Sequence, residues 1–296
     1  MKKCIAEIKK QKEQRLEEEF KAIQENTNID AKLRRTLDLL REKSAGAWLT
    51  CLPIQSLGYA FNKEDFQDGV RYRYNWRMPG TPSHCSCGKE NTTDHMMICK
   101  LGGYVTMRHN RIRDLEAELM REVCHDVRVE PTLIPIAEDS NRSGNTANKA
   151  RLDVSGVGVW GPYEKTYLDI RVMHPNAPSY LNKSLDQVYE AHEKEKKRDY
   201  LERVIQIEKG SFTPIVMSTH GGCGTEANRH HKRIATLIAE KRKESYADVV
   251  NYIRTRLRVS LMKSVLTAIR GVRGKRRETA APISSLDFNL IEHTEE

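Results

Sequence analysis

Two short segments of alternating polarity, joined by a turn, constrain the fold of this chain more than any other feature. The first segment contains Asp153, the second contains Asp169, and Trp160-Gly161-Pro162-Tyr163 lies between them. Adjacent Gly and Pro residues are a strong turn signal. If the chain folds back at Gly161, residues at equal distances from it face each other, and the two aspartates lie side by side with Cβ atoms about 4.5–5.5 Å apart. A strand alternates with a period of two, which puts the apolar side chains on the other face: Leu152, Val154, Leu168, Ile170 and Val172.

Two carboxylates this close repel each other unless a cation lies between them. Mg²⁺ is typically held by one or two carboxylates together with substrate phosphate. The pair therefore predicts metal-dependent phosphodiester chemistry, with Asp153 and Asp169 binding a catalytic Mg²⁺ or Mn²⁺ ion. Arg171 follows on the same face as Asp169. An arginine stays protonated and cannot act as a base, but it can stabilise the charge of a phosphorane.

A charged helix predicted over residues 182–208 supplies a lysine to this site. Lys196 and Tyr200 lie one helical turn apart on one face. Lys196 could orient the attacking water or neutralise the scissile phosphate, and the alternative is that it belongs to a solvated helix face. An earlier amphipathic helix, predicted over residues 105–124, places Glu116 on the same stripe as His109. Glu116 is a candidate third metal-facing carboxylate, with an exposed helix glutamate as the alternative.

A compact group of soft ligands precedes that helix. Cys85, Cys87, His95 and Cys99 fall within 15 residues, and Gly88 suits the tight turn of a zinc knuckle. Three thiolates and one imidazole complete a tetrahedral zinc shell, so the predicted zinc site is structural. A second group, Cys223 with His230 and His231, is a much weaker metal candidate.

The composition favours a nucleic-acid partner and a reducing compartment. The chain of 296 residues has a formal net charge of +9, with 31% charged residues. The seven cysteines are an odd number and three of them cluster with a histidine, which argues against a disulfide framework. We see no apolar run that could cross a membrane and no signal peptide, so we expect a nuclear or intracellular protein that is not secreted and contacts no membrane. The basic residues selected as nucleic-acid contacts are Arg71, Arg73, Arg108, His109, Arg151 and Lys197.

Residues 71–77 alternate basic and aromatic side chains, which could stack on bases and grip phosphate. A half-buried strand or helix explains the same alternation. The remaining patterns predict strands over residues 127–136 and 213–218 and a turn at residues 221–224. The predicted organisation is a charged helical segment (1–43), a linker region (44–103) that includes the zinc knuckle (84–103), a nuclease core (104–225), C-terminal helices in two pieces (226–272) and a disordered tail (273–296). A polar loop is expected at 138–149.

The order of these motifs resembles a known family. A Cys-Cys-His-Cys knuckle is followed by Arg108-His109-Asn110 at a helix start, then by Arg151-Leu152-Asp153, a second aspartate, and Lys196 with Tyr200 on a helix. This order is similar to the PD-(D/E)xK-type, restriction-enzyme-like endonuclease domain at the C-terminus of site-specific non-LTR retrotransposon polyproteins. Leu152 replaces the family's proline, and Asp199 stands where a second lysine often precedes the tyrosine. The resemblance covers residues 44–272.

The resemblance implies an α/β (α+β) fold: a restriction-endonuclease-like mixed central sheet flanked by helices, with a small zinc knuckle and helical N- and C-terminal extensions. It implies an enzyme that nicks target DNA so that the exposed 3′ end primes reverse transcription. The partners would be DNA, possibly the RNA of the element, and a reverse transcriptase domain of the same element. Two alternatives stay open: a catalytically inactive nucleic-acid-binding zinc protein derived from such a nuclease, and a zinc-stabilised interaction module.

Overall fold

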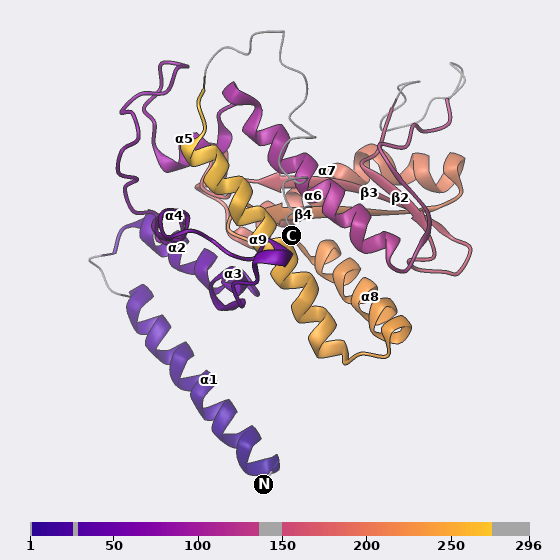
Figure 1. Ribbon diagram of the computed structural model, residues 1–296, viewed down its shortest axis with the longest axis horizontal. Helices are drawn as coiled ribbons and strands as arrows, with labels where there is room; N and C mark the ends of the chain where they lie inside the picture. The colour runs from indigo at the N-terminus through magenta and orange to yellow at the C-terminus, as the bar shows by residue number, and fades with distance from the viewer. Residues whose placement is uncertain (1, 26–28, 136–149, 274–296) are drawn as a thin grey trace, which may run out of the picture.

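The computed structural model describes residues 2–25, 29–135 and 150–273. The loop predicted over residues 138–149 and the tail from residue 274 onward therefore lie outside the described residues. Of the helices that the structure describes, none has an apolar stretch of the length needed to cross a bilayer. Helix α1 (Lys2–Glu25) runs away from the rest of the molecule (Figure 1).

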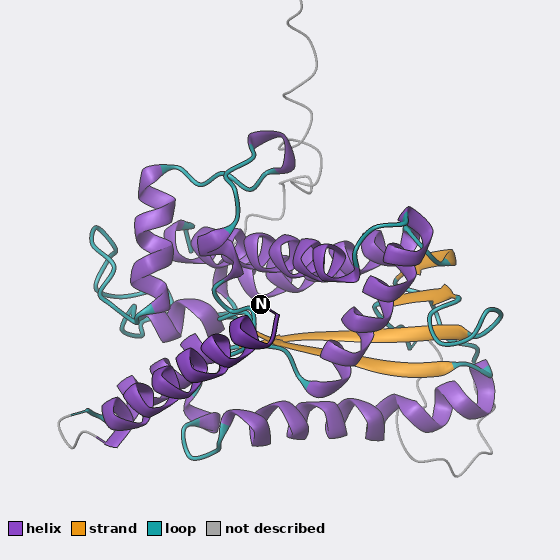
Figure 2. Ribbon diagram, turned by 90° about the horizontal axis from the view of Figure 1, so that it is seen from below, coloured by secondary structure: helices purple, strands orange, loops and turns teal. Residues whose placement is uncertain are grey.

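The described chain folds into a mixed sheet with helices on both sides (Figure 2). The strand order is β1-β2-β3-β4, with β1/β2 and β2/β3 antiparallel and β3/β4 parallel. The remaining bounds are α2 (Ala31–Arg41), α3 (Ala47–Thr50), η1 (Gln55–Leu57), α4 (Lys63–Arg73), α5 (Thr93–Ile98), η2 (Leu101–Gly103), α6 (Tyr104–Arg121), β1 (His125–Val129), β2 (Val154–Val157), β3 (Lys165–Met173), η3 (Pro178–Tyr180), α7 (Leu185–Arg203), η4 (Val204–Glu208), β4 (Ser211–Ser218), α8 (Thr225–Arg242) and α9 (Tyr246–Arg270).

The predicted hairpin forms with the predicted register. Val154 pairs with Leu168 and Ser155 with Tyr167, so partners are equidistant from Gly161. Just before β2, the Asp153 N–H donates to the Leu168 carbonyl at 3.0 Å, which extends the pairing to the two aspartates. One detail of the prediction is wrong, because Leu152 lies outside the ladder and packs with Tyr167 rather than with Val154.

Helix α7 connects β3 to the parallel strand β4 and covers one face of the sheet. Its Val188 and Tyr189 pack with Met173 and Val216. Side chains alternate along β3, so Asp169 and Arg171 point to the α7 face while Leu168 and Ile170 point to the opposite one. The predicted strand at residues 127–136 is shorter than expected, because β1 ends at Val129.

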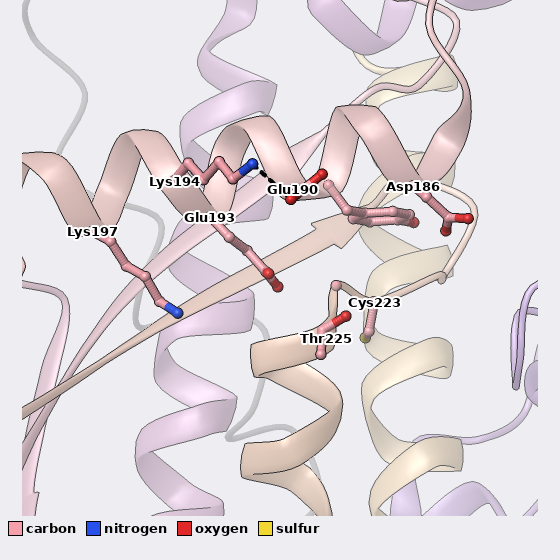
Figure 3. A pocket seen from close by; sticks show the side chains of 9 residues that line it. Asp186, Glu190, Glu193, Lys194, Lys197, Cys223 and Thr225 are labelled. Carbon is pink, nitrogen blue, oxygen red and sulfur yellow. Dashed lines mark ion pairs between the residues drawn. The ribbon is translucent and has the colours of Figure 1, made fainter.

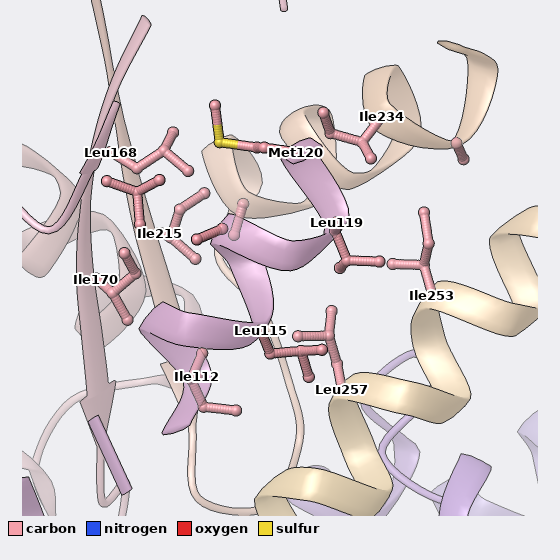
Figure 4. Packing of buried hydrophobic residues seen from close by; sticks show 14 of the residues in the cluster. Ile112, Leu115, Leu119, Met120, Leu168, Ile170, Ile215, Ile234, Ile253 and Leu257 are labelled. Carbon is pink, nitrogen blue, oxygen red and sulfur yellow. The ribbon is translucent and has the colours of Figure 1, made fainter. Parts of the chain in front are cut away.

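Helix α6 fills the opposite face between the sheet and α9. Leu115 and Leu119 lie between strand residues such as Leu168 and the α9 residues Ile253 and Leu257 (Figure 4). All of them are at most 6% exposed. This layer is the main core, and the two C-terminal helices that build it, α8 and α9, match the two pieces predicted for residues 226–272.

Helix α5, which carries part of the cysteine cluster, is tied to the body from two sides. Asp94 pairs with Lys32 of α2 at 2.8 Å and with His174, just after β3, at 3.0 Å. On the other side, the Arg108 guanidinium donates to the Met97 carbonyl at 2.9 Å. The cluster is therefore fixed relative to the sheet through buried polar contacts.

Candidate functional site

Asp153 and Asp169 meet at the start of the hairpin, as the sequence predicted. Asp153 Oδ2 accepts a hydrogen bond from the Ile170 N–H at 2.6 Å, and its Oδ1 is 3.0 Å from His109 Nε2. Asp169 Oδ2 is 2.8 Å from Lys196 Nζ. The two carboxyl groups lie close enough for each to shift the pKa of the other. Strand pairing brings the two acids together, while α6 and α7 supply His109 and Lys196.

The pKa values of the two carboxyl groups are shifted in opposite directions. Burial raises the pKa of Asp153, but His109 and the Ile170 N–H outweigh it, so this pKa ends below its usual value. Burial raises the pKa of Asp169 to about 6, although Lys196 opposes the shift, because the charge of Asp153 adds to the effect of burial. Asp169 therefore takes up a proton at a higher pH than Asp153 does.

Lys196 is the predicted helix residue that reaches this pair. Its side chain is 18% exposed and crosses from α7 to Asp169. Tyr200, one turn later, instead packs its ring against Phe212 with the centroids 6.0 Å apart. Lys196 is thus part of the acidic site, and Tyr200 supports the sheet beneath it.

Arg171 is turned away from the aspartates. Its guanidinium donates to Glu195 Oε2 at 2.5 Å and to His192 Nδ1 at 2.6 Å, both on α7. Burial and this neighbouring cation lower the pKa of His192, which accepts the hydrogen bond as a neutral ring. In this arrangement Arg171 neutralises Glu195 and does not contact Asp169.

Glu116 belongs to a different cluster from the one predicted. It is fully buried, which also excludes the alternative of an exposed helix glutamate. Glu116 Oε1 is 2.7 Å from His231 Nε2, and Oε2 is 3.7 Å from His230 Nε2. Two helical turns separate it from His109, about 10 Å along α6. It therefore serves the interface of α6 with α8 and not the aspartate pair.

The basic residues predicted to bind nucleic acid are mostly held by other parts of the chain. Arg108 is 2% exposed and its guanidinium is bound to the Met97 carbonyl, so the prediction of a phosphate contact is wrong. Of residues 71–77, the first three form the end of α4, as in the helical alternative, and the rest follow it as a turn and a loop. The other partners are Asp68 for Arg71, the Leu40 carbonyl for Arg73, Asp153 for His109, Glu130 for Arg151 and Glu226 for Lys197.

The Cys-Cys-His-Cys group is assembled as predicted. The ligand atoms of Cys85, Cys87, His95 and Cys99 all lie within 4.8 Å of one another. Gly88 adopts φ +84°, and its N–H donates to the Cys85 carbonyl at 2.8 Å, which makes the tight turn. Such a group can hold a metal ion such as zinc. Across the described part of the chain it is the one group of three or more His, Cys, Asp or Glu side chains whose ligand atoms lie close enough together to hold a metal ion.

Two contacts of buried carboxylates had no clear sequence signal. His109 was selected as a nucleic-acid contact, yet it binds Asp153, which is 44 residues away. Likewise, no pattern near Glu116 in the sequence predicts its contact with His231, because that contact depends on how α6 and α8 pack. No family model matches the sequence, and no curated protein matches it. The function must therefore be argued from these side chains.

Proposed function

We propose that this protein is a metal-dependent endonuclease that hydrolyses phosphodiester bonds in DNA, on a fold of the restriction-endonuclease type. The observation that carries the proposal is the position of Asp153 beside Asp169, fixed by its hydrogen bonds to Leu168 and Ile170, with Lys196 2.8 Å from the second carboxylate. Two adjacent acids and a lysine are the groups that hold a divalent cation and a phosphate together. The mixed sheet flanked by helices is consistent with such a fold.

The aspartate pair fits a divalent cation. Asp169 Oδ2 is buried and makes no aligned hydrogen bond, although Lys196 Nζ lies close to it. This oxygen is therefore paired electrostatically with Lys196 and still has a free direction for a ligand. Asp153 and Asp169 would hold Mg²⁺ or Mn²⁺. When bound, such an ion lowers the pKa of a coordinated water and stabilises charge on the phosphate.

The other residues of the site have separate tasks in the proposal. His109 holds the Asp153 carboxylate in one orientation. Lys196 carries the positive charge that would neutralise the scissile phosphate or orient the attacking water. Arg171 could stabilise developing charge only after leaving Glu195. His109 and Lys196 are therefore the groups already in contact with the two aspartates, whereas Arg171 is bound to Glu195.

The Cys-Cys-His-Cys group takes a structural role in this proposal. With four protein ligands a zinc ion has no open position for substrate. Zinc would fix α5, and through it the start of α6 that carries His109.

The sequence resemblance suggests a setting for this activity. The protein would nick target DNA in the nucleus, and the exposed 3′ end would prime reverse transcription. The RNA of the element and a reverse transcriptase domain would be further partners.

A plasmid nicking assay with matched Asp-to-Asn variants tests the proposal. With Mg²⁺ or Mn²⁺, wild type should convert supercoiled plasmid to open circles, and Asp153→Asn and Asp169→Asn should each reduce the rate at least ~100-fold. Asp126→Asn is the control, because that aspartate is an exposed residue of β1. All variants should keep wild-type circular dichroism and zinc content. Nicking by Asp169→Asn at the wild-type rate would refute the site.

Binding of nucleic acid without cleavage is the second candidate, and one observation favours it. Tyr74 and Trp76 stack with ring centroids 5.2 Å apart and are 41% and 57% exposed. Exposed aromatic rings are typical platforms for nucleic-acid bases. If wild type shifts DNA on a gel in a salt-dependent way but never cleaves it, and Trp76→Ala weakens the shift, this candidate replaces the nuclease.

A further inference from the structure

A second cluster of ionisable groups lies where α6, α8 and α9 meet the loop before α8. Cys223 Sγ accepts a hydrogen bond from the Arg258 guanidinium at 3.2 Å, and it lies close enough to His231 for each to shift the pKa of the other. His231 Nε2 is in turn 2.7 Å from Glu116 Oε1. The order thiol, imidazole, carboxylate is the arrangement that activates a cysteine nucleophile.

Two cations of this cluster favour an ionised thiol. Arg258 is permanently positive and 3% exposed, and His231 is held as an imidazolium by Glu116. A buried charge without a partner is costly. Because Cys223 Sγ lies 3.2 Å from the Arg258 guanidinium, a Cys223 thiolate places an anion directly against this buried cation.

The position of Cys223 in the fold also favours the ionised thiol. It lies immediately before Gly224, the N-cap of the 18-residue helix α8. The start of a helix carries a partial positive charge that favours a thiolate. Burial raises the pKa of this thiol, but Arg258 and His231 outweigh it, so the pKa lies below that of an ordinary cysteine. Burial lowers the pKa of His231, but Glu116 and Cys223 outweigh it and raise it to about 9.

Three further groups face the cluster. His230 on α8 is buried, and burial lowers its pKa to about 4, so it contributes no charge at neutral pH. Tyr189 on α7 also faces Cys223, and burial raises the pKa of its phenol, so it stays neutral. Glu42 faces Arg258, and burial raises its pKa to about 7, so it shares the neutralisation of Arg258 with Cys223 as the pH rises.

A hollow of about 470 Å³ leads to this cysteine. Cys223 and Thr225 lie on one wall, opposite Glu190 and Glu193 of α7 (Figure 3). Cys223 is partly exposed while its sulfur also contacts Arg258, so the thiol is recessed. Such access suits a small reagent. The hollow is lined by neither Asp153 nor Asp169, which makes it separate from the proposed nuclease site.

We propose that Cys223 is a reactive thiolate that is oxidised by small hydroperoxides such as hydrogen peroxide. The sulfur attacks one peroxide oxygen, an S–O bond forms and the O–O bond breaks. The leaving hydroxide takes the proton of the His231 imidazolium and departs as water. Sulfur loses two electrons, the peroxide gains them, and the product is a sulfenic acid, which thiols can reduce again. Glu116 is a positioning residue that holds His231.

The test compares two cysteines of one molecule. Cys51 is also partly exposed, but burial raises its pKa and its thiol donates to the Trp48 carbonyl. Full-length, zinc-loaded protein is treated with hydrogen peroxide at pH 7, sulfenic acid is trapped with dimedone, and each peptide is quantified by mass spectrometry. Cys223 should be labelled at least ~10-fold faster than Cys51, because only a few per cent of an ordinary thiol is ionised at this pH. Equal rates would overturn the proposal.

Three measurements separate ionisation from access. The absorbance of thiolate near 240 nm should be larger in wild type than in Cys223→Ser at pH 7, and no difference would refute the thiolate. The rate at Cys223 should rise less steeply between pH 6 and 8 than the rate at Cys51. His231→Gln should slow labelling at Cys223 about 10-fold while leaving Cys51 unchanged. If that variant fails to fold, the wild-type pH profile decides.

Discussion

The sheet has a buried carboxyl group on each of its two sides, and the pKa values of these two groups are shifted in opposite directions. Asp169, on the α7 side, is pushed toward the protonated form by burial and by Asp153. Glu116, on the α6 side, is more deeply buried, yet its pKa is lowered because His231 and His230 outweigh burial. Burial alone therefore does not decide the charge of a carboxyl group. The number and distance of its charged neighbours do, and this separates a site suited to bind a cation from one that is already satisfied.

The largest effect that would test this comparison is the loss of Glu116. Glu116→Ala leaves the buried His231 and Arg258 without their carboxylate, and we expect the free energy of unfolding to fall by about 3–5 kcal/mol. Asp169→Ala should change it by less than about 1 kcal/mol, because Lys196 can turn to solvent. Urea denaturation followed by circular dichroism measures both. Glu116→Gln is the matched control and should cost less than Glu116→Ala, since an amide still hydrogen-bonds a neutral His231. Equal losses for Glu116→Ala and Asp169→Ala would contradict the comparison.

Lys196 provides the next largest effect, on activity instead of stability. If the protein nicks DNA as proposed, Lys196→Met should lower the rate ~100-fold to ~1000-fold, because the variant keeps the shape of the side chain and loses its charge near the phosphate. The neighbouring lysine, Lys194, pairs only with Glu190 on the surface of α7, so Lys194→Met is the control and should nick normally. A normal rate for Lys196→Met would remove this residue from the site.

The paired state of Glu116 and His231 predicts a stability that depends on pH. His231 has its pKa raised from 6.5 to about 9 in the folded protein. Its stabilising contribution is therefore complete below pH 6.5 and is lost as the pH rises through 9, with an upper limit of about 3 kcal/mol. Denaturation of wild type between pH 6.5 and pH 9 should show this fall, and His231→Gln should lack it. A parallel fall in both proteins would mean that other groups are responsible.

His109 offers the smallest and most specific test. It hydrogen-bonds Asp153 without reaching Asp169, so it should act through orientation of one carboxylate. His109→Ala should reduce nicking between ~10-fold and ~100-fold, as for residues that orient metal-binding carboxylates. The loss should show in the concentration of Mg²⁺ that gives half-maximal nicking. If that concentration is unchanged, His109 has no orienting role.

The sequence predicted the parts of this molecule that depend on local pattern. The period of two and the Gly161-Pro162 turn specify the hairpin, and the hairpin alone brings Asp153 to Asp169. The cysteine cluster was predictable for the same reason, since its four ligands are close in the chain. Leu152 was misplaced because strand alternation was extended past the first residue of the ladder.

What could not be predicted depends on the packing of distant helices. Glu116 contacts His231, which is 115 residues away in the sequence. Its position on the core-facing edge of α6 is equally compatible with a contact to the aspartate pair and with a contact to α8. Arg108 looked like a phosphate ligand because arginine near a helix start is often exposed, whereas here α5 covers it. Charge and position along the chain do not reveal which neighbour buries a side chain.

The attachment of α5 has a consequence for the order in which the chain folds. Asp94 joins Lys32, which precedes it by about 60 residues, to His174, which follows it by 80. Contacts between such distant residues close large loops, and the entropy of closure delays them until the segments they join already exist. The cysteine loop can gather its ligands locally and early, but it can dock only after β3 has formed. Metal capture and docking would then be separate kinetic phases, of which only the second reports on the completed sheet.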